Sequence, residues 1–243
     1  SDRELTLKLV EKRPELYEFA SDENKADKEI AETCFKSDGR LIRFAPESIR
    51  SDPEVALIAA TDYPLCVAFL TGEAAESKKV AMVVAESGGS AIEMLPKKFF
   101  SDKDIARAAV SKNARNIRFF TDDVRADESV CLAALAQDRT VCAYFSNDAF
   151  SSDKVFEKSV RADRGVISPN TLSNDMPPGL FEKIAEKKMT VRLTSQKLDL
   201  LTIDYEKLYA VLRICVGNVI RKKELLARVV EKDDKKCAEL LCK

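Results

Sequence analysis

Two groups of three arginines are the residues of this chain best suited to bind a charged partner. The second group repeats the internal spacing of the first, and the six are Arg40, Arg43, Arg50, Arg115, Arg118 and Arg125. Guanidinium groups bind carboxylates and phosphates bidentately, so the two groups predict contacts to such groups on a partner, with the clusters about 25–30 Å apart if each repeat adds one helix layer. The alternative is that they are solvated helix ends that form salt bridges with Glu47, Asp122 or Asp123.

Catalysis has little support in this composition. Histidine is absent, which removes the most common general base, the usual activator of serine and cysteine nucleophiles and the most common metal ligand. Gly88 and Gly89 stand alone and lack the spacing of a nucleotide-binding loop. We therefore predict no enzymatic activity, no catalytic residue, no cofactor and no metal site.

The cysteines favour a structural interpretation. There are seven, none in a Cys-x-x-Cys pair: Cys34, Cys66, Cys131, Cys142, Cys215, Cys237 and Cys242. Because most lie inside apolar runs, we interpret them as reduced cysteines that pack as small core hydrophobes. A disulfide framework or a zinc site is the alternative. Reduced cysteines indicate a reducing compartment, so we expect a cytoplasmic protein.

The charge balance bears on the kind of partner. Forty basic residues oppose 41 acidic ones, a net charge of -1, so no overall field attracts nucleic acid or an anionic membrane. Between the two arginine groups the equivalent positions hold Ala68 and Glu93, which interrupts any basic stripe. No apolar stretch approaches the ~20 residues that a membrane-spanning helix needs. We expect no membrane span, and nucleic acid is the less favoured partner.

The elements that position these side chains recur with a period of about 25 residues, in the range typical of repeat proteins. When the chain is cut at this period from Ser1, the fifth position of each unit is apolar: Leu5, Ile30, Val55, Val80, Ile105, Val130, Val155, Leu180 and Tyr205. The tenth position is apolar as well: Val10, Phe35, Ala60, Ala85, Val110, Leu135, Val160, Ala185 and Ala210. In a chain with 45% apolar residues, two such columns establish a real repeat of about nine units.

Each unit predicts a long helix. Positions five, six, nine and ten form one apolar stripe at helical spacing, which indicates a helix over positions two to eleven. The pairs Ser1…Glu4 and Ser51…Glu54 have the spacing of a capping box, in which either the serine or the following aspartate is the N-cap. This gives the recurrent carboxylates at positions two and four a capping role rather than a catalytic one.

A second, shorter apolar run follows a break near position 13 or 14, as in residues 41–44 and 116–119. We interpret these runs as short α- or 3₁₀-helices, and a strand is the local alternative. Position 19 holds large side chains: Phe19, Phe44, Phe69, Met94, Phe119 and Tyr144. We interpret this column as interior packing between neighbouring units, and a ladder for stacking bases is the alternative.

These observations predict an all-α fold, a right-handed or gently curved α-solenoid of about nine 25-residue repeats, each with one ten-residue helix and one short helix. We expect the repeat array over residues 1–200. Regularity fades after the sixth unit, and the helices look longer from about Leu201. We therefore expect residues 201–243 to form an irregular helical C-terminal cap of the same array.

The segments Ala26–Ile30 and Gly39–Arg50 resemble the repeat of the family known as domain of unknown function 4116, with a good match from about residue 26 to 150. Two departures, Ser77-Lys78 in the fourth unit and the lack of glycine in the fifth, bring the helix caps of those units into question. The resemblance implies a helical repeat array used for interaction, and it implies no activity, cofactor or catalytic residue.

The function predicted first is a non-catalytic scaffold that binds a protein or peptide partner, and we expect a monomer. The alternatives are a nucleic-acid-binding repeat protein and a regulatory module of a larger enzyme.

Overall fold

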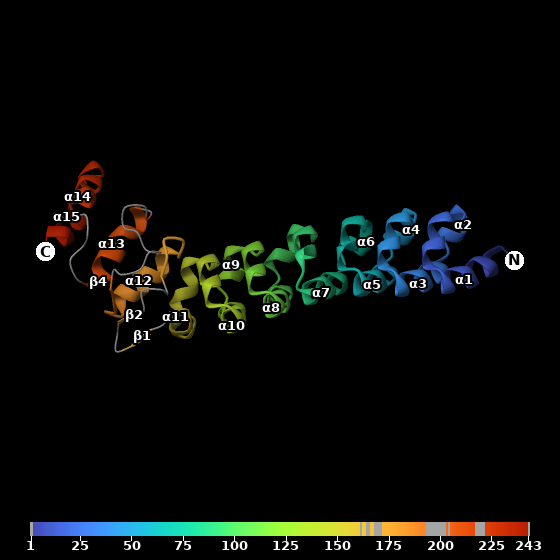
Figure 1. Ribbon diagram of the computed structural model, residues 1–243, viewed down its shortest axis with the longest axis horizontal. Helices are drawn as coiled ribbons and strands as arrows, with labels where there is room; N and C mark the ends of the chain where they lie inside the picture. The colour runs from blue at the N-terminus through green and yellow to red at the C-terminus, as the bar shows by residue number, and fades with distance from the viewer. Residues whose placement is uncertain are drawn as a thin grey trace. The chain divides into compact units, whose positions relative to one another are not determined.

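The structure, a computed structural model, describes residues 2–160, 162–163, 166–167, 172–192, 203, 205–216 and 222–242. The chain divides into two compact units, Ser1–Val124 and Arg125–Lys243, and helices dominate both (Figure 1). Among the described residues, no helix has the length and apolar character needed to cross a membrane.

One long helix per repeat organises the first unit. These helices are α1 (Asp2–Lys12), α3 (Lys28–Ser37), α5 (Pro53–Asp62), α7 (Lys78–Ser87) and α8 (Lys103–Lys112). The last four are ten residues long and begin at the same position of successive 25-residue repeats, as the period predicts. Within this unit, consecutive long helices pack against each other in chain order, from α1 to α8.

Aspartate, not serine, is the N-cap of most of these helices. The Asp52 carboxylate accepts hydrogen bonds from the backbone N–H groups of Glu54 and Val55. Asp102 acts in the same way, and Asp27 accepts one such bond, from Ile30. In the fourth repeat Ser77 stands at this position and its side chain makes no capping bond. The doubt raised by that departure is therefore confirmed.

The predicted apolar stripe is confirmed. Positions five, six, nine and ten are buried in each of the ten-residue helices of the first unit; in α8 they are Ile105, Ala106, Ala109 and Val110. Alanine is frequent at these positions, and its small side chain lets neighbouring helices approach closely. The first unit thus has a continuous apolar core between its helix layers.

Each repeat of the first unit contains two further helices, not the single short helix that we predicted. The first is a 3₁₀-helix: η1 (Pro14–Phe19), η2 (Gly39–Phe44), η3 (Pro64–Phe69), η4 (Ser90–Met94) and η6 (Ala114–Phe119). The second is about one turn long: α2 (Asp22–Lys25), α4 (Glu47–Arg50), α6 (Gly72–Ala75), η5 (Lys97–Ser101) and α9 (Asp122–Arg125). The η1, η2, η3 and η4 helices pack against one another in order.

The second unit begins with the same kinds of element. They are α10 (Glu128–Gln137), η7 (Arg139–Tyr144), η8 (Asn147–Ser151) and α11 (Asp153–Ser159). Later helices are α12 (Pro178–Glu186), α13 (Tyr205–Ile214), α14 (Lys222–Glu231) and α15 (Lys235–Cys242). The described parts of α13 and α14 have ten residues each, and the expectation of longer helices after Leu201 also involves residues 204 and 217–221, which lie outside the described residues. The proposed array–cap boundary near residue 200 stays a prediction.

Four short strands also lie in the second unit, so the all-α prediction holds for most of the described chain but not here. They are β1 (Ala162–Asp163), β2 (Val166–Ile167), β3 (Thr190–Arg192) and β4 (Cys215–Val216). The sheet order is β1-β2-β3-β4, antiparallel between β1 and β2 and parallel for the other two pairs.

The three parallel strands replace the short helices of the seventh, eighth and ninth repeats. Val166 pairs with Thr190, and Val191 pairs with Cys215, so the partners in each pair are separated by close to one repeat period. These segments are rich in β-branched residues, which favour extended backbone. The strand alternative considered for the short runs is therefore correct in this part of the chain.

Candidate partner-binding surface

Two of the six arginines of interest serve the fold. Arg50 Nη1 donates a hydrogen bond to the carbonyl oxygen of Phe69, 3.2 Å away, and Arg125 Nη1 donates one to the carbonyl oxygen of Tyr144, 3.0 Å away. In both cases the acceptor ends the 3₁₀-helix of the next repeat. Both side chains have a buried Nε, so we assign these arginines to the structure of the array.

The guanidinium of Arg40 forms an ion pair with a carboxylate of its own repeat. Its Nε and Nη2 each lie 2.8 Å from an oxygen of Asp38. The hydrogen bonds from Arg40 are the main reason that the pKa of Asp38 lies below its usual value, and the same bonds raise the pKa of Arg40. This arrangement is a local ion pair at the start of η2.

Arg43 and Arg118 lie over aromatic rings. The guanidinium carbon of Arg43 is 4.6 Å from the ring centre of Phe44, and that of Arg118 is 4.6 Å from the ring centre of Phe119. Arg118 also lies 3.5 Å from the carboxylate of Glu93 in the preceding repeat. Arg40 and Arg118 thus form ion pairs with Asp38 and Glu93, two acids that were not among those we expected.

Arg115 is exposed, and its backbone N–H is bonded to the side chain of Asn113. Arg40, Arg43 and Arg50 lie in the first unit with Arg115 and Arg118, whereas Arg125 is the first residue of the second unit. Partner binding by the six remains a prediction. Arg43, Arg115 and Arg118 are exposed and, among the described residues, are bonded neither to a backbone carbonyl nor to an acid of their own repeat.

The interpretation of position 19 as interior packing holds only in part, because Phe44 and Phe69 are partly buried and pack against the hydrophobic core. Phe19 is 78% exposed and Met94 49% exposed, and Phe44, Phe69 and Phe119 are half-buried. The following position is the buried one, with Ala45, Leu70, Leu95 and Phe120 in the core. The five residues of the first unit at position 19 therefore form a row of exposed and half-buried side chains, which we call the apolar ledge: Phe19, Phe44, Phe69, Met94 and Phe119.

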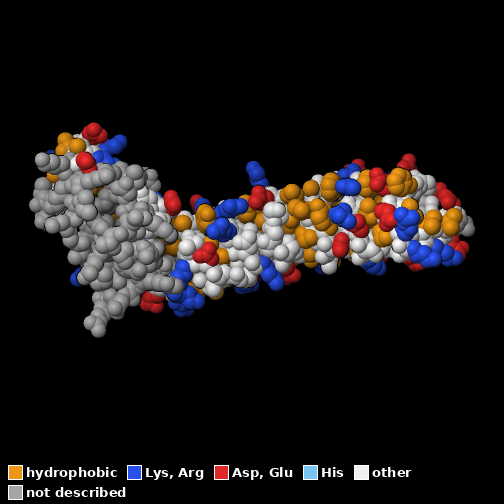
Figure 2. All heavy atoms as spheres, in the orientation of Figure 1, with side chains coloured by type: hydrophobic (Ala, Val, Ile, Leu, Met, Phe, Trp, Pro, Cys, Tyr) orange, Lys and Arg blue, Asp and Glu red, His pale blue; other side chains and the backbone are white. Residues whose placement is uncertain are grey.

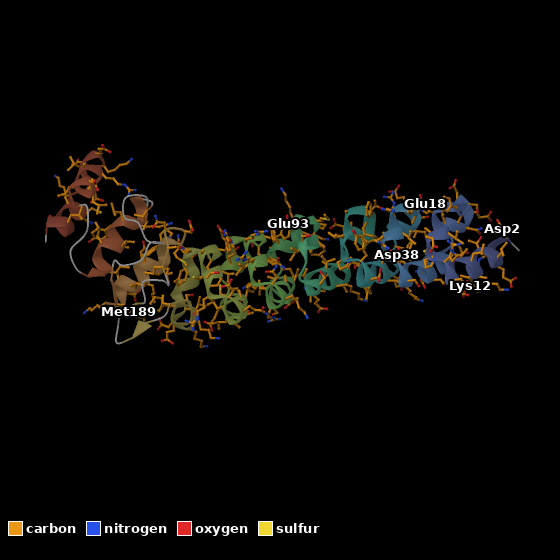
Figure 3. The ribbon with its side chains drawn as sticks, in the orientation of Figure 1. Asp2, Lys12, Glu18, Asp38, Glu93 and Met189 are labelled. Atoms are coloured by element: carbon orange, nitrogen blue, oxygen red, sulfur yellow. The ribbon has the colours of Figure 1, made fainter. Side chains whose placement is uncertain are left out.

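The ledge follows the 3₁₀-helices along the first unit. Figure 2 shows hydrophobic side chains gathered near α2, α4 and α6, with charged side chains between them. Glu18 and Glu93, which precede two of the ledge residues in sequence, lie on the same side of the unit, whereas Lys12 at the end of α1 lies on the opposite side (Figure 3). The ledge and the long helices thus occupy different faces.

The long-helix face carries a ladder of ion pairs between repeats. A cation at position three bridges the acids at positions two and four of the next repeat: Lys28 lies 2.9 Å from Asp52 and 2.6 Å from Glu54. Arg3 contacts Asp27 and Glu29, and Lys78 contacts Asp102 and Asp104, in the same pattern.

This ladder refines the role of the recurrent carboxylates. The aspartate at position two both caps its own helix and receives the cation of the preceding repeat, whereas the acid at position four pairs with that cation instead of completing a capping box. In the third repeat the cation is replaced by Pro53, and Ser77 replaces the aspartate that it would meet. The ladder is therefore interrupted between the third and fourth repeats.

The first three repeats resemble a known family. Residues 2–40 and 27–73 match the family model described as Domain of unknown function (DUF4116). The resemblance is confirmed for residues 2–73. The two matches begin at Asp2 and Asp27, which are one repeat apart. The match starts earlier than the residue-26 limit that we expected, and residues 74–150 lie beyond it. No curated protein and no solved structure matches the chain.

The described cysteines are buried thiols without a disulfide: Cys34, Cys66, Cys131, Cys142 and Cys237. Burial raises the pKa of Cys66 to about 12, so this thiol stays protonated and unreactive at neutral pH. Cys215 and Cys242 are outside the residues whose side chains are described. Within the described part of the chain, no group of three or more Cys, Asp or Glu side chains is arranged to hold a metal ion.

A shallow open groove lies between α7 and α8 on the long-helix face. Its lining is Lys78, Met82, Asp104, Arg107, Ala108 and Ser111. Asp104 pairs with Arg107 across 2.9 Å and also contacts Lys78, so the charged groups of the groove satisfy one another. The ledge, where the exposed groups are apolar, is the better candidate for binding.

Proposed function

We propose that the chain is a non-catalytic helical-repeat scaffold that binds a protein or peptide partner along the apolar ledge. One observation carries the proposal: five consecutive repeats place a large apolar side chain at the same position, and each of the five is at least partly exposed. Removing such a row from water on binding is favourable, and contiguous exposed apolar patches mark interaction sites in soluble proteins.

The architecture that we propose is an α-solenoid of about nine repeats, right-handed or gently curved. Its support is the order of packing, in which each long helix of the first unit contacts the next, and the persistence of the period into the parallel strands of the second unit. Arrays of this kind offer long surfaces on which one repeat position is presented many times. Buried cysteines that form no disulfide among the described residues support a reducing, cytoplasmic location.

Site-specific photo-crosslinking in cells tests the proposal. A photoreactive amino acid is placed at Phe44 or Phe69, and the matched control carries it at Glu86, an exposed residue of α7 on the long-helix face. We expect specific protein adducts from the two ledge positions and not from the control. The same protein set from all three positions, or no protein adduct from the ledge, would contradict the proposal.

A purified partner permits a second measurement. Replacing Phe44 and Phe69 by serine removes two central apolar side chains, and we expect about a tenfold or larger loss of affinity, as for interface hot spots. Glu86→Ser leaves the affinity unchanged. Circular dichroism of each variant shows whether the helices are retained.

Nucleic-acid binding is the second candidate, and one observation favours it. Arg43 over Phe44 and Arg118 over Phe119 combine a guanidinium with a flat ring, which suits base stacking. Glu18 and Glu93 beside the same row oppose it by repelling phosphates. Fluorescence anisotropy with labelled single-stranded RNA at several salt concentrations decides: salt-dependent binding supports this function, and its absence removes it.

The third alternative, a regulatory module of a larger enzyme, stays a prediction. Assays of the full-length gene product for an activity that changes when residues 1–124 are deleted would test it.

A further inference from the structure

A column of charges runs beside the apolar ledge. The residue before each ledge residue is exposed, and in chain order these are Glu18, Arg43, Ala68, Glu93 and Arg118. Their charges are negative, positive, neutral, negative and positive. The 3₁₀-helices that carry them pack in the same order from η1 to η4, and the Arg118–Glu93 pair links η4 to η6. The order in sequence is therefore also the order in space.

When this column is read from its other end, every charged position has the opposite sign. If a second identical row is laid against the first in the opposite direction, Glu18 faces Arg118, Arg43 faces Glu93, and Ala68 faces its own copy. All four charged positions then meet an opposite charge. A parallel arrangement in register would place every charge against itself, which is repulsive.

We propose that the occupant of the ledge is a second copy of this chain, docked antiparallel with a two-fold axis near Phe69. The proposal rests on the proposed function, because it takes the ledge to be a protein-binding surface and names the partner. The contact is isologous, so each copy contributes the same residues and the assembly closes as a dimer. It replaces the monomer that we expected from the sequence.

The apolar residues fit the same arrangement. Antiparallel docking sets Phe19 against Phe119, Phe44 against Met94 and Phe69 against its own copy. Each pair joins large flat or flexible side chains that are at least partly exposed in the single chain, with Phe19 the most exposed at 78%. Aromatic and methionine side chains are enriched in such interface cores.

The charged groups are available for a partner. Glu18 and Arg43 form no ion pair within the described residues. The Arg118–Glu93 pair is long at 3.5 Å, and the two side chains are 47% and 49% exposed, so both are able to turn toward a second copy. This internal pair competes with the dimer, which limits the affinity.

The size of the ledge determines the affinity that we expect for the dimer. Five short helices spaced about 8–10 Å apart give a row about 32–40 Å long, and one helix is about 10–12 Å wide. The footprint is then about 400 Å² per copy, about half of the roughly 800 Å² per partner of a standard interface. We therefore expect a dimer of micromolar affinity, weakened by salt because its charged pairs lie at the rim.

Sedimentation velocity over low to several hundred micromolar protein tests this inference. The wild-type chain associates to a dimer, and Glu18→Arg weakens the association by about tenfold because it sets two positive charges opposite each other. Adding Arg118→Glu to Glu18→Arg restores the homodimer, since both charges are exchanged. This double variant does not form mixed dimers with the wild type.

Two further variants locate the contact. Phe69→Glu puts a charge on the two-fold axis and abolishes the dimer. Leu9→Glu changes a residue of α1 that is 43% exposed and outside the ledge, and it leaves the dimer intact. Circular dichroism confirms that each variant keeps its helices.

A chain that stays monomeric over the whole range overturns the inference. So does association that is lost with Leu9→Glu but kept with Phe69→Glu, or a double variant that fails to recover. A photoreactive amino acid at position 69 distinguishes failure of the dimer proposal from failure of the proposed scaffold function. A monomeric chain that captures a different protein at Phe69 keeps the scaffold function and loses the dimer, whereas a monomeric chain that captures nothing loses both.

Discussion

Arg50 precedes Phe69 in sequence by most of one repeat, and its guanidinium donates a hydrogen bond to the Phe69 carbonyl oxygen across 3.2 Å. The same relationship recurs in the second unit, where Arg125 reaches the carbonyl oxygen of Tyr144 at 3.0 Å. An arginine at the end of one repeat therefore closes the 3₁₀-helix of the next. Arg50 belongs to the scaffold that holds the ledge in place.

Replacing Arg50 by alanine should destabilise the chain. The Phe69 carbonyl loses its charged donor, and we expect the free energy of unfolding to fall by about 1–2 kcal/mol. Arg40→Ala is the matched control, because Arg40 is exposed and pairs with Asp38 in its own repeat; we expect almost no change, as for surface ion pairs in general. Urea unfolding followed by circular dichroism measures both, and equal effects would refute the assignment.

Gly39 should tolerate no side chain. A Cβ at this residue would meet the backbone carbonyl oxygen of Ala59 in α5 inside van der Waals contact, and backbone cannot move aside cheaply. Gly39→Ala is expected to cost about 1–3 kcal/mol of stability through overpacking. Gly89 occupies the same repeat position, and its nearest neighbour would be Ser87 Oγ at 3.8 Å, so Gly89→Ala should be nearly neutral. Thermal unfolding of the two variants makes the comparison.

The long helices could be predicted from sequence because their burial pattern continues along the whole helix in α3, α5, α7 and α8. The stripe at positions five, six, nine and ten is long enough to show a helical period, and Ile105 and Val110 are buried as that period requires. The 3₁₀-helices have five or six residues and show no such period. Two adjacent apolar columns, at positions 19 and 20, are then equally plausible as core.

The prediction for position 19 did not consider the apolar column at position 20. Phe44 is larger than Ala45, yet Ala45 is the buried one, because positions 16, 17 and 20 of the short helix face the core. The ledge was therefore visible in the sequence as a column but not as a surface. The role of Arg50 could not be predicted for another reason. Its acceptor is a backbone carbonyl of the next repeat, and every residue has such a group, so the sequence does not indicate which carbonyl is bound.

The buried cysteines should resist modification in the folded chain. Burial raises the pKa of Cys34, Cys66, Cys131 and Cys142 to about 12, so almost no thiolate exists at neutral pH. We expect iodoacetamide to label these thiols only when the chain is unfolded in urea, with a large increase in rate on unfolding. Mass spectrometry of the labelled peptides provides the readout. Rapid labelling of Cys66 in the native chain would contradict its burial.

Acid should weaken the ladder of ion pairs on the long-helix face. The Arg3 hydrogen bond is the largest cause of the lowered pKa of Asp27. At Asp102 burial alone would raise the pKa, but the bonds from Lys78 and from two backbone N–H groups outweigh it and the pKa is lowered. A carboxylate with a lowered folded-state pKa contributes stability above its unfolded value, about 3.9, and loses it as the pH falls through the folded value.

The chain should therefore unfold more easily below about pH 4 than at neutral pH, and Asp102→Asn should reduce this difference. Asparagine still caps the helix N-terminus, so the variant tests the charge and not the cap. Asp22→Asn at the exposed start of α2 is the matched control and leaves the acid dependence as in the wild type. Urea midpoints measured at neutral and acidic pH give the comparison. If Asp102→Asn and wild type lose the same stability on acidification, the ladder does not contribute.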